Sequence, residues 1–439
     1  MSTTKRLRSL NINNINPHVK EAKYAVRGEL AIKSEEYRGK LAKGDANLPF
    51  DKVISANIGN PQQLDQKPIT FFRQVLSLVE YPPLLENEDI LLNQLGYKTD
   101  VIERARWLLK QVGSVGAYSA SAGSLGIRQS VAKFIERMKP SISYVPVQWL
   151  TVCLGRDGHP ADPANIYLTA GASSGVNTLL HVICAIPDTG VLVPIPQYPL
   201  YTASLSVINS KCVPYYLDES KNWGTNLDAI KTACKNAQDE GTDVRAIVII
   251  NPGNPTGGSL HESDVRAIIE FAAQENLVII ADEVYQTNVF IGKFHSFRGI
   301  LGNMQKENPG KFDTVELASL HSISKGMVGE CGHRGGYFEL VGFDKEVQEQ
   351  IYKFVSITLC SPVIGQCLVE MMVNPPKEGE PSYELYKKEY NDIFQGLHKR
   401  ATALYEAFKE MEGVECGEPQ VSIISLPLAD PLPAESLLT

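Results

Sequence analysis

Short, almost wholly apolar segments alternate with helical segments through most of this 439-residue chain. The strand-like segments are residues 165–169, 191–195, 212–217, 245–250, 277–281, 316–320 and 336–340. Helical spacing of apolar residues marks segments 101–112, 126–137, 173–185, 227–237, 262–275 and 382–411, with Asp100 as the expected N-cap of the first. Strands that are apolar along their whole length are buried on both faces. The alternation therefore predicts an α/β fold, with a mostly parallel central sheet covered by helices.

The composition excludes several classes of protein and of site. A net charge of -8 argues against nucleic acid as a partner, and no apolar run approaches the ~20 residues of a membrane span. The 8 cysteines are scattered without a CxxC pair, which predicts reduced thiols and neither a zinc site nor a disulfide scaffold. The first 20 residues lack the apolar stretch of a secretory signal. We expect a cytoplasmic protein, and a mitochondrial presequence is the alternative.

Polar or aromatic side chains follow five of the predicted strands, at the point where each strand ends. They lie in segments 171–174, 197–198, 251–257, 282–285 and 321–325. Ligands of open α/β sheets bind outside the carboxyl ends of the strands, so these loops predict one ligand site at a single edge of the sheet.

Lys325 lies in the segment Ser-Ile-Ser-Lys-Gly, where a solvated surface charge is the plainer interpretation. A lysine that forms an imine needs a dry pocket that lowers its pKa. Ser322 and Ser324 offer hydroxyls to a phosphate, and Arg334 offers a bidentate guanidinium to the same group. The turn at residues 171–174 opens a helix, whose first N–H groups also favour a phosphate.

The other loops carry groups that suit an aromatic ring. Asp282 is either a helix N-cap or the partner of a protonated ring nitrogen. Tyr285 is either a core tyrosine or a hydrogen-bond donor to a ring hydroxyl. Asn254 lies in a turn and could point its amide at a ligand, while Tyr198 could stack on a ring.

The segments INPGNPTG, ADEVY, SISKG and HRGGY, in this order and spacing, resemble those of the fold-type I pyridoxal-phosphate (PLP) aminotransferases. Residues 57–62, 116–123, 197–203 and 319–337 resemble the alanine aminotransferase branch, and the similarity runs from about residue 23 to about residue 420. The resemblance implies an N-terminal arm with part of a small domain at 1–69, a large PLP-binding domain at 70–365, and a connector helix with a truncated α+β small domain at 366–439.

The resemblance also implies a role for each matched residue. Lys325 resembles the lysine that binds PLP covalently, Asp282 the acid at the pyridine nitrogen, and Tyr198 the aromatic stacked on the ring. The residues that resemble the pair at the ring hydroxyl are Tyr285 and Asn254, and those that resemble the phosphate cradle are Ala172, Ser173, Ser322, Ser324 and Arg334. Tyr118 resembles the tyrosine that reaches the phosphate of a neighbouring subunit, which implies a homodimer. Gly59 resembles the glycine beside the substrate carboxylate.

The implied reaction is a ping-pong transamination of amino acids and 2-oxo acids. L-Alanine and 2-oxoglutarate would give pyruvate and L-glutamate, with Lys325 as general base and acid. The sequence leaves two alternatives. One is a PLP-binding but catalytically impaired relative, and the other is an aminotransferase of aromatic amino acids or kynurenine, or a cyclopropane-forming synthase.

Two segments depart from the family pattern. Residues 138–155 replace a short turn, and we interpret them as an unspliced intron or similar artefact that forms an exposed excursion, with an apolar β-hairpin as the alternative. Residues 421–439 replace a Gly-Ala-Met-Tyr-like strand and the rest of the small domain. No arginine follows Arg400 to match the family's carboxylate-binding arginine, so we expect a poor transaminase with part of the 382–411 helix uncovered.

Overall fold

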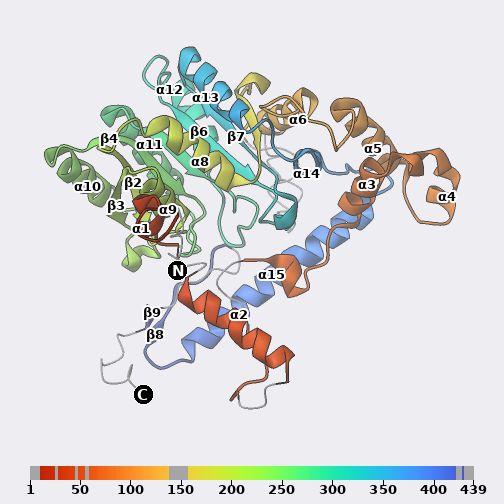
Figure 1. Ribbon diagram of the computed structural model, residues 1–439. Helices are drawn as coiled ribbons and strands as arrows, with labels where there is room; N and C mark the ends of the chain where they lie inside the picture. Colours follow the sequence, from red (N-terminus) through yellow and green to blue (C-terminus); the bar gives the residue numbers. More distant parts are fainter. Residues whose placement is uncertain are drawn as a thin grey trace, which may run out of the picture.

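The computed structural model describes residues 10–24, 28–44, 48–54, 59–137, 157–421 and 428–429. Its centre is a seven-stranded sheet with the strand order β1-β7-β6-β5-β4-β2-β3 (Figure 1). The strands are β1 Ile166–Thr169, β2 Thr189–Ile195, β3 Lys211–Tyr216, β4 Asp243–Ile250, β5 Val278–Asp282, β6 Leu317–Ser322 and β7 Gly336–Val341. Four neighbouring pairs are parallel, and only β7 runs antiparallel to its neighbours β1 and β6. The predicted α/β fold with a mostly parallel sheet is confirmed.

Two sets of helices cover the two faces of the sheet, since the strands are buried along most of their length. One set is α10 Leu227–Asp239, α11 Glu262–Glu275 and α12 Phe297–Glu307. The other set is α8 Ala172–Ile183, α9 Leu200–Val207 and α13 Lys345–Ile357. Each set of helices buries a cluster of aliphatic and aromatic side chains against its own face of the sheet.

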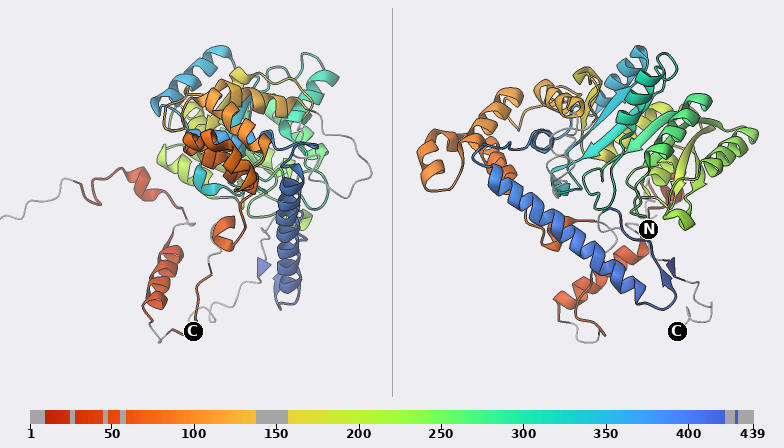
Figure 2. Two further views of the ribbon diagram at one scale, coloured as in Figure 1. Left: turned by 90° about the vertical axis from the view of Figure 1, so that its right-hand side faces the viewer. Right: turned by 180° about the vertical axis from the view of Figure 1, so that it is seen from behind.

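A third apolar cluster lies beside the sheet. Its helices are α3 Thr70–Glu80, α5 Thr99–Val112, α6 Leu125–Glu136, α14 Val363–Val373 and α15 Tyr383–Lys409. Figures 1 and 2 show α15 as a long rod that runs from beside α3 away from the sheet body. Its buried side chains end at Ala401, and Leu404 and Met411 beyond it are exposed.

Asp100 is not the N-cap that the sequence suggests, because α5 begins earlier with Lys98 as its N-cap. The carboxylate of Asp100 instead accepts hydrogen bonds from the N–H (3.1 Å) and hydroxyl (2.8 Å) of Ser382, ahead of α15. A contact between segments that lie 282 residues apart has overridden the local signal.

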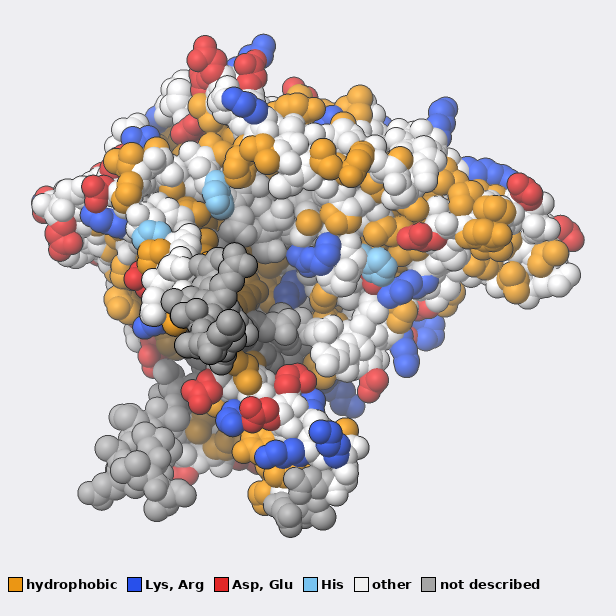
Figure 3. Space-filling view, viewed as in Figure 1, with side chains coloured by type: hydrophobic (Ala, Val, Ile, Leu, Met, Phe, Trp, Pro, Cys, Tyr) orange, Lys and Arg blue, Asp and Glu red, His pale blue; other side chains and the backbone are white. Residues whose placement is uncertain are grey.

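Shorter elements flank this body. They are α1 Pro17–Glu21, α2 Glu29–Ala42, α4 Glu88–Asn93, β8 Val414–Glu415, β9 Leu428–Ala429 and the 3-10 turns η2 Pro61–Leu64, η3 Pro82–Asn87, η4 Pro163–Asn165, η5 Glu219–Lys221 and η6 Cys331–His333. The end formed by η3 and α4 projects from the body and is rich in hydrophobic side chains (Figures 1 and 3). Tyr81, Ile90 and Leu95 are exposed there.

The two segments that depart from the family pattern are largely outside the described residues. This holds for the whole of 138–155 and for 421–439 except three positions. Val421 is one of these, and it is buried against Val284 and Tyr285 and bridges Val289. Within the described part of the chain, no helix is long and apolar enough to cross a membrane, and no cluster of side chains could hold a metal ion.

Candidate active site

The candidate site lies at the carboxyl edge of the sheet, and the strand order explains why its residues meet there. Strands β1, β2, β4, β5 and β6 all point the same way, so the loops after them emerge at one edge. Strand β7 enters antiparallel between β1 and β6, so its first residue, Gly336, lies at that same edge. Arg334, two residues earlier, is thereby placed between the loop after β1 and the loop after β6.

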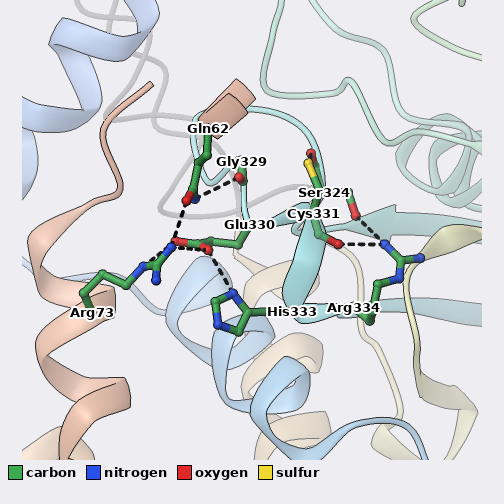
Figure 4. A network of polar contacts seen from close by, with 8 residues as sticks. All are labelled: Gln62, Arg73, Ser324, Gly329, Glu330, Cys331, His333 and Arg334. Carbon is green, nitrogen blue, oxygen red and sulfur yellow. Dashed lines mark hydrogen bonds and ion pairs between the residues drawn. The ribbon is translucent and has the colours of Figure 1, made fainter. Parts of the chain in front are cut away.

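Arg334 joins these two loops by hydrogen bonds. Its Nη2 donates to the Ala170 carbonyl oxygen (2.8 Å) and to Ser173 Oγ (3.3 Å), both beyond β1. Its Nη1 donates to Ser324 Oγ (3.3 Å) and to the Cys331 carbonyl oxygen (3.0 Å), as Figure 4 shows. The Ser322 hydroxyl completes the group with a 3.0 Å bond to Ser324 Oγ. One cation and three hydroxyls therefore converge at the start of α8.

This cluster has the chemistry of a phosphate site. Ala172 and Ser173 open α8, where the first N–H groups of a helix have no partner within it and attract anions. Gly171 precedes them with a φ of +84°, which favours glycine. A Cβ on Gly171 would lie 2.3 Å from Arg334 Nη2, so the cradle requires the glycine at this position. The donor set and the space left by Gly171 fit a phosphate monoester.

Lys325 follows β6 and points its amine at the opposite side of the site. Its Nζ donates to the carbonyl oxygen of Gly59 (3.2 Å) and lies 5.9 Å from the centre of the Tyr285 ring. Burial lowers the pKa of Lys325 from its ordinary 10.5, while Cys331 and Asp282 oppose that shift and Arg334 adds to it. A larger share of this amine is therefore neutral near pH 7 than of a surface lysine.

This lowered pKa gives a prediction for the pH dependence of cofactor capture. Only the neutral amine attacks an aldehyde, so the rate at which PLP bonds to Lys325 should rise with pH and have its midpoint below the ordinary 10.5 of a lysine. Asp282→Asn removes a charge that raises the pKa of Lys325, so the midpoint should move to lower pH. Stopped-flow absorbance measures the rate of PLP bonding against pH for the wild type and for Asp282→Asn. The range of roughly pH 6–11 covers the titration of a lysine. If the wild type has the same midpoint as a free lysine, the assignment of Lys325 as the buried lysine that bonds PLP is wrong.

Asp282 ends β5 and is buried, with one carboxylate oxygen bonded to a tyrosine. Tyr201 Oη donates to Asp282 Oδ2 at 2.7 Å, and the Val284 N–H donates to Oδ1 at 3.4 Å. Burial raises the pKa of Asp282, whereas the two hydrogen bonds and Lys325 lower it. A positive charge in the site would favour the carboxylate form further.

Tyr201 is a site residue that the sequence analysis did not single out. It lies three residues after Tyr198, at the start of α9, and is completely buried. Tyr198 lies ahead of α9, which begins at Leu200, so no helical spacing relates the two phenols, and the sequence offers no local signal for Tyr201. Its acceptor, Asp282, lies 81 residues further along the chain, and nothing local indicates that pairing.

The remaining predicted ring contacts lie around the same point. Asn254 Nδ2 is 3.5 Å from Tyr285 Oη, and burial raises the pKa of that phenol. Tyr198 Oη shares a 2.6 Å hydrogen bond with Tyr24 Oη, and their rings meet edge to face. Tyr24 belongs to the N-terminal arm and was also not predicted. Tyr118 is not brought into the site, since it is 78% exposed in a loop before α6.

Comparison with known proteins identifies similar chains. A family model described as aminotransferase class I and II matches residues 89–439. A protein of Saccharomyces cerevisiae named "Alanine aminotransferase, mitochondrial" is 51% identical over 425 residues, which are 96% of this chain and 69% of that protein. Another from the same yeast, named "Inactive alanine aminotransferase", is 48% identical over 94% of this chain and 79% of its own length. The solved structure of an alanine aminotransferase from Pyrococcus furiosus has the same fold, with a TM-score of 0.70 at 20% identity, over 95% of this chain and 85% of that one.

Proposed function

Because this chain belongs to the alanine aminotransferase branch of the class I and II aminotransferases, which depend on PLP, we propose that it transfers the amino group of L-alanine to 2-oxoglutarate. The products are pyruvate and L-glutamate. The observation that carries the proposal is the convergence of Lys325, Asp282 and Arg334 at one sheet edge, in a chain 51% identical to an alanine aminotransferase.

The donors at the site support the following assignment of each part of the cofactor to a set of side chains. Arg334 and the start of α8 hold the phosphate, together with the hydroxyls of Ser173, Ser322 and Ser324. Asp282 would face the ring nitrogen, and its bond from Tyr201 keeps one oxygen fixed. Tyr285 and Asn254, whose side chains lie 3.5 Å apart, would meet the ring hydroxyl, and Tyr198 would stack on the ring. Bound there, PLP supplies an aldehyde for amine exchange and a ring that withdraws electrons from the substrate Cα.

Lys325 is the residue that moves the proton. With PLP and an amino acid bound, its neutral Nζ would take the proton from the substrate Cα and, as the ammonium, would give it to the imine carbon on the other side of the nitrogen. Burial lowers the pKa of this amine, which favours the neutral form that the first role needs. The Gly59 carbonyl oxygen lies 3.2 Å from Nζ, which supports the proposal that the substrate carboxylate binds beside Gly59.

We propose that the protein is a homodimer. Tyr118 is 78% exposed and lies outside this chain's own site, which fits the family role of a tyrosine that reaches the phosphate of a second copy, and the projecting end at η3 and α4 carries exposed apolar side chains. Apolar patches of this kind mark contacts between proteins. Sedimentation of the PLP-loaded protein tests this proposal.

The amino donor and the compartment are separate proposals. The 51% identical relative is named mitochondrial, which favours the mitochondrial alternative over the cytoplasm, and a fluorescent fusion of the natural gene decides between them. The aromatic alternatives predict turnover of phenylalanine or kynurenine in place of alanine.

A PLP-binding protein without turnover is the second candidate function, since one close relative is named inactive. The test is an assay of alanine and 2-oxoglutarate turnover on protein whose PLP content has been measured by absorbance. We expect pyruvate and glutamate to form in equal amounts. Full PLP content without turnover of any amino acid would favour the second candidate, and failure to bind PLP would refute both.

A further inference from the structure

A buried carboxylate lies between the Lys325 loop and the first helix of the neighbouring helical cluster. Glu330 is 2% exposed, and both of its oxygens are engaged by Arg73 of α3: Nε donates to Oε1 and Nη2 to Oε2, each at 3.0 Å. His333 Nδ1 lies 2.9 Å from the same Oε2 (Figure 4). A bidentate pair with a buried carboxylate fixes direction as well as distance.

Arg73 also holds a second segment. Its Nη2 donates to Gln62 Oε1 at 2.9 Å, and Gln62 Nε2 donates to the Gly329 carbonyl oxygen at 3.1 Å. Figure 4 shows that the four residues form a closed ring, in which Gln62 joins Arg73 to the peptide beside Glu330. The backbone of Gly329 also lies close to side chains of segment 59–66, because a Cβ on Gly329 would lie 2.6 Å from Gln66 Nε2 and 3.5 Å from Pro61 Cβ.

The same two segments meet again at the amine of Lys325. Gly59 lies three residues before Gln62, and its carbonyl oxygen accepts from Lys325 Nζ. On the other segment the Gly329 N–H donates to the Lys325 carbonyl oxygen at 3.4 Å. Each segment is therefore tied to the other at two points, one at the reactive amine and one at the ring of Arg73, Glu330, Gly329 and Gln62.

We propose that Arg73 and Gln62 are positioning residues, which hold segment 59–66 over Lys325 and so fix the place where the amino-acid substrate binds. This inference rests on the proposed transamination for the identity of the substrate. The cradle around Arg334 has its own bonds to Ser173 and Ser324, so cofactor affinity does not depend on the ring. The hydrogen-bonded ring of Arg73, Glu330, Gly329 and Gln62 therefore acts on substrate binding and not on cofactor binding.

Gln62→Met is the first test, because Gln62 is only half-buried and methionine keeps its size while removing both amide bonds. We expect the KM for alanine to rise about tenfold, with kcat and PLP affinity within about twofold of the wild type, which is the pattern of lost uniform substrate binding. Arg73→Gln should raise the KM further, because it releases Glu330 as well as Gln62.

Arg104→Gln is the matched control, since Arg104 Nη1 pairs at 2.9 Å with Glu370, another fully buried carboxylate. That pair joins α5 to α14 and does not involve segment 59–66, so Arg104→Gln should lower stability and leave the alanine KM unchanged. If Arg73→Gln fails to fold, Gln62→Met decides alone. An unchanged KM in Gln62→Met overturns the proposal.

Amide hydrogen exchange provides a measurement that needs no turnover. The Asp65 and Gln66 N–H groups are bonded to the Pro61 carbonyl oxygen, so exchange at residues 60–66 reports whether the segment stays in place. Gln62→Met and Arg73→Gln should exchange severalfold faster there, and Arg104→Gln should not. If the wild type turns over no amino acid, the proposed function fails while exchange still tests the positioning role. Unchanged exchange in Gln62→Met overturns it.

Discussion

Lys325→Ala is expected to abolish transamination and the covalent attachment of PLP together. The substitution removes both the amine that bonds the cofactor and the base that moves the Cα proton. General acid–base catalysis alone contributes about 10²–10⁴ in rate, so turnover should fall by at least about ten thousandfold once the second role is included. The measurement is pyruvate formation by PLP-loaded protein.

Mass spectrometry identifies the lysine directly. Borohydride reduction of the loaded wild type should leave a pyridoxyl group on the peptide that contains Lys325. Lys311→Ala is the matched control, because Lys311 is exposed and pairs only loosely with Glu270 at 3.9 Å. It should keep both turnover and label. A label on another lysine, or turnover that survives in Lys325→Ala, would rule out the assignment.

Asp282→Ala is expected to cause the second largest loss. A carboxylate beside a ring nitrogen raises the pKa of that nitrogen by about 1–3 units, and each unit is worth about 1.36 kcal/mol. Without it the ring is largely neutral at pH 7, and turnover should fall by roughly 10²–10³-fold. Cofactor affinity, measured by fluorescence titration, should fall as well.

Tyr201→Phe should produce a smaller loss of turnover through the same carboxylate. It keeps the buried ring and removes the 2.7 Å hydrogen bond to Asp282, which should lower turnover by about tenfold. Tyr215→Phe is its control, because Tyr215 is equally buried and its hydroxyl bonds the Val248 carbonyl oxygen at 2.8 Å. Equal effects of the two substitutions would show that Tyr201 acts only through packing. Unchanged turnover in Asp282→Ala would show that the ring nitrogen has another partner.

Local patterns were enough for the strands of the sheet and for α5, α6, α8, α10, α11 and α15, because the period of the apolar residues follows from burial on one face or on two, but they did not mark α9, α12 and α13. They were also enough to place Asp282 and Lys325 at strand ends. They could not give the order of the strands, and hence the approach of Arg334 to Ser173, since β1 and β7 pair across about 170 residues.

Contacts between distant segments account for what the sequence analysis missed. Asp100 accepts a hydrogen bond from Ser382 and is not the N-cap of α5. The hydrogen bond from Tyr201 to Asp282 adds a residue to the site. The contact of Gly59 with Lys325 spans 266 residues and was not predicted, since the family resemblance placed Gly59 only beside the substrate carboxylate. Nothing in the sequence around Arg73 indicates a functional role. Its proposed positioning role depends on the contact with Glu330, which lies 257 residues away in the chain.

The antiparallel insertion of β7 has a consequence for how the protein matures. A ribosome releases β1 long before β7, yet Arg334 reaches Ser173 only after β7 has threaded between β1 and β6. Pairing over so long a stretch of chain is slow, because the entropy lost in closing the loop precedes the stabilisation from the strand contacts. The anion site therefore cannot form until the chain has been synthesised through β7. A vitamin B6 coenzyme that binds only the finished sheet would stabilise that state by mass action, so its supply in the cell would govern the yield of folded protein.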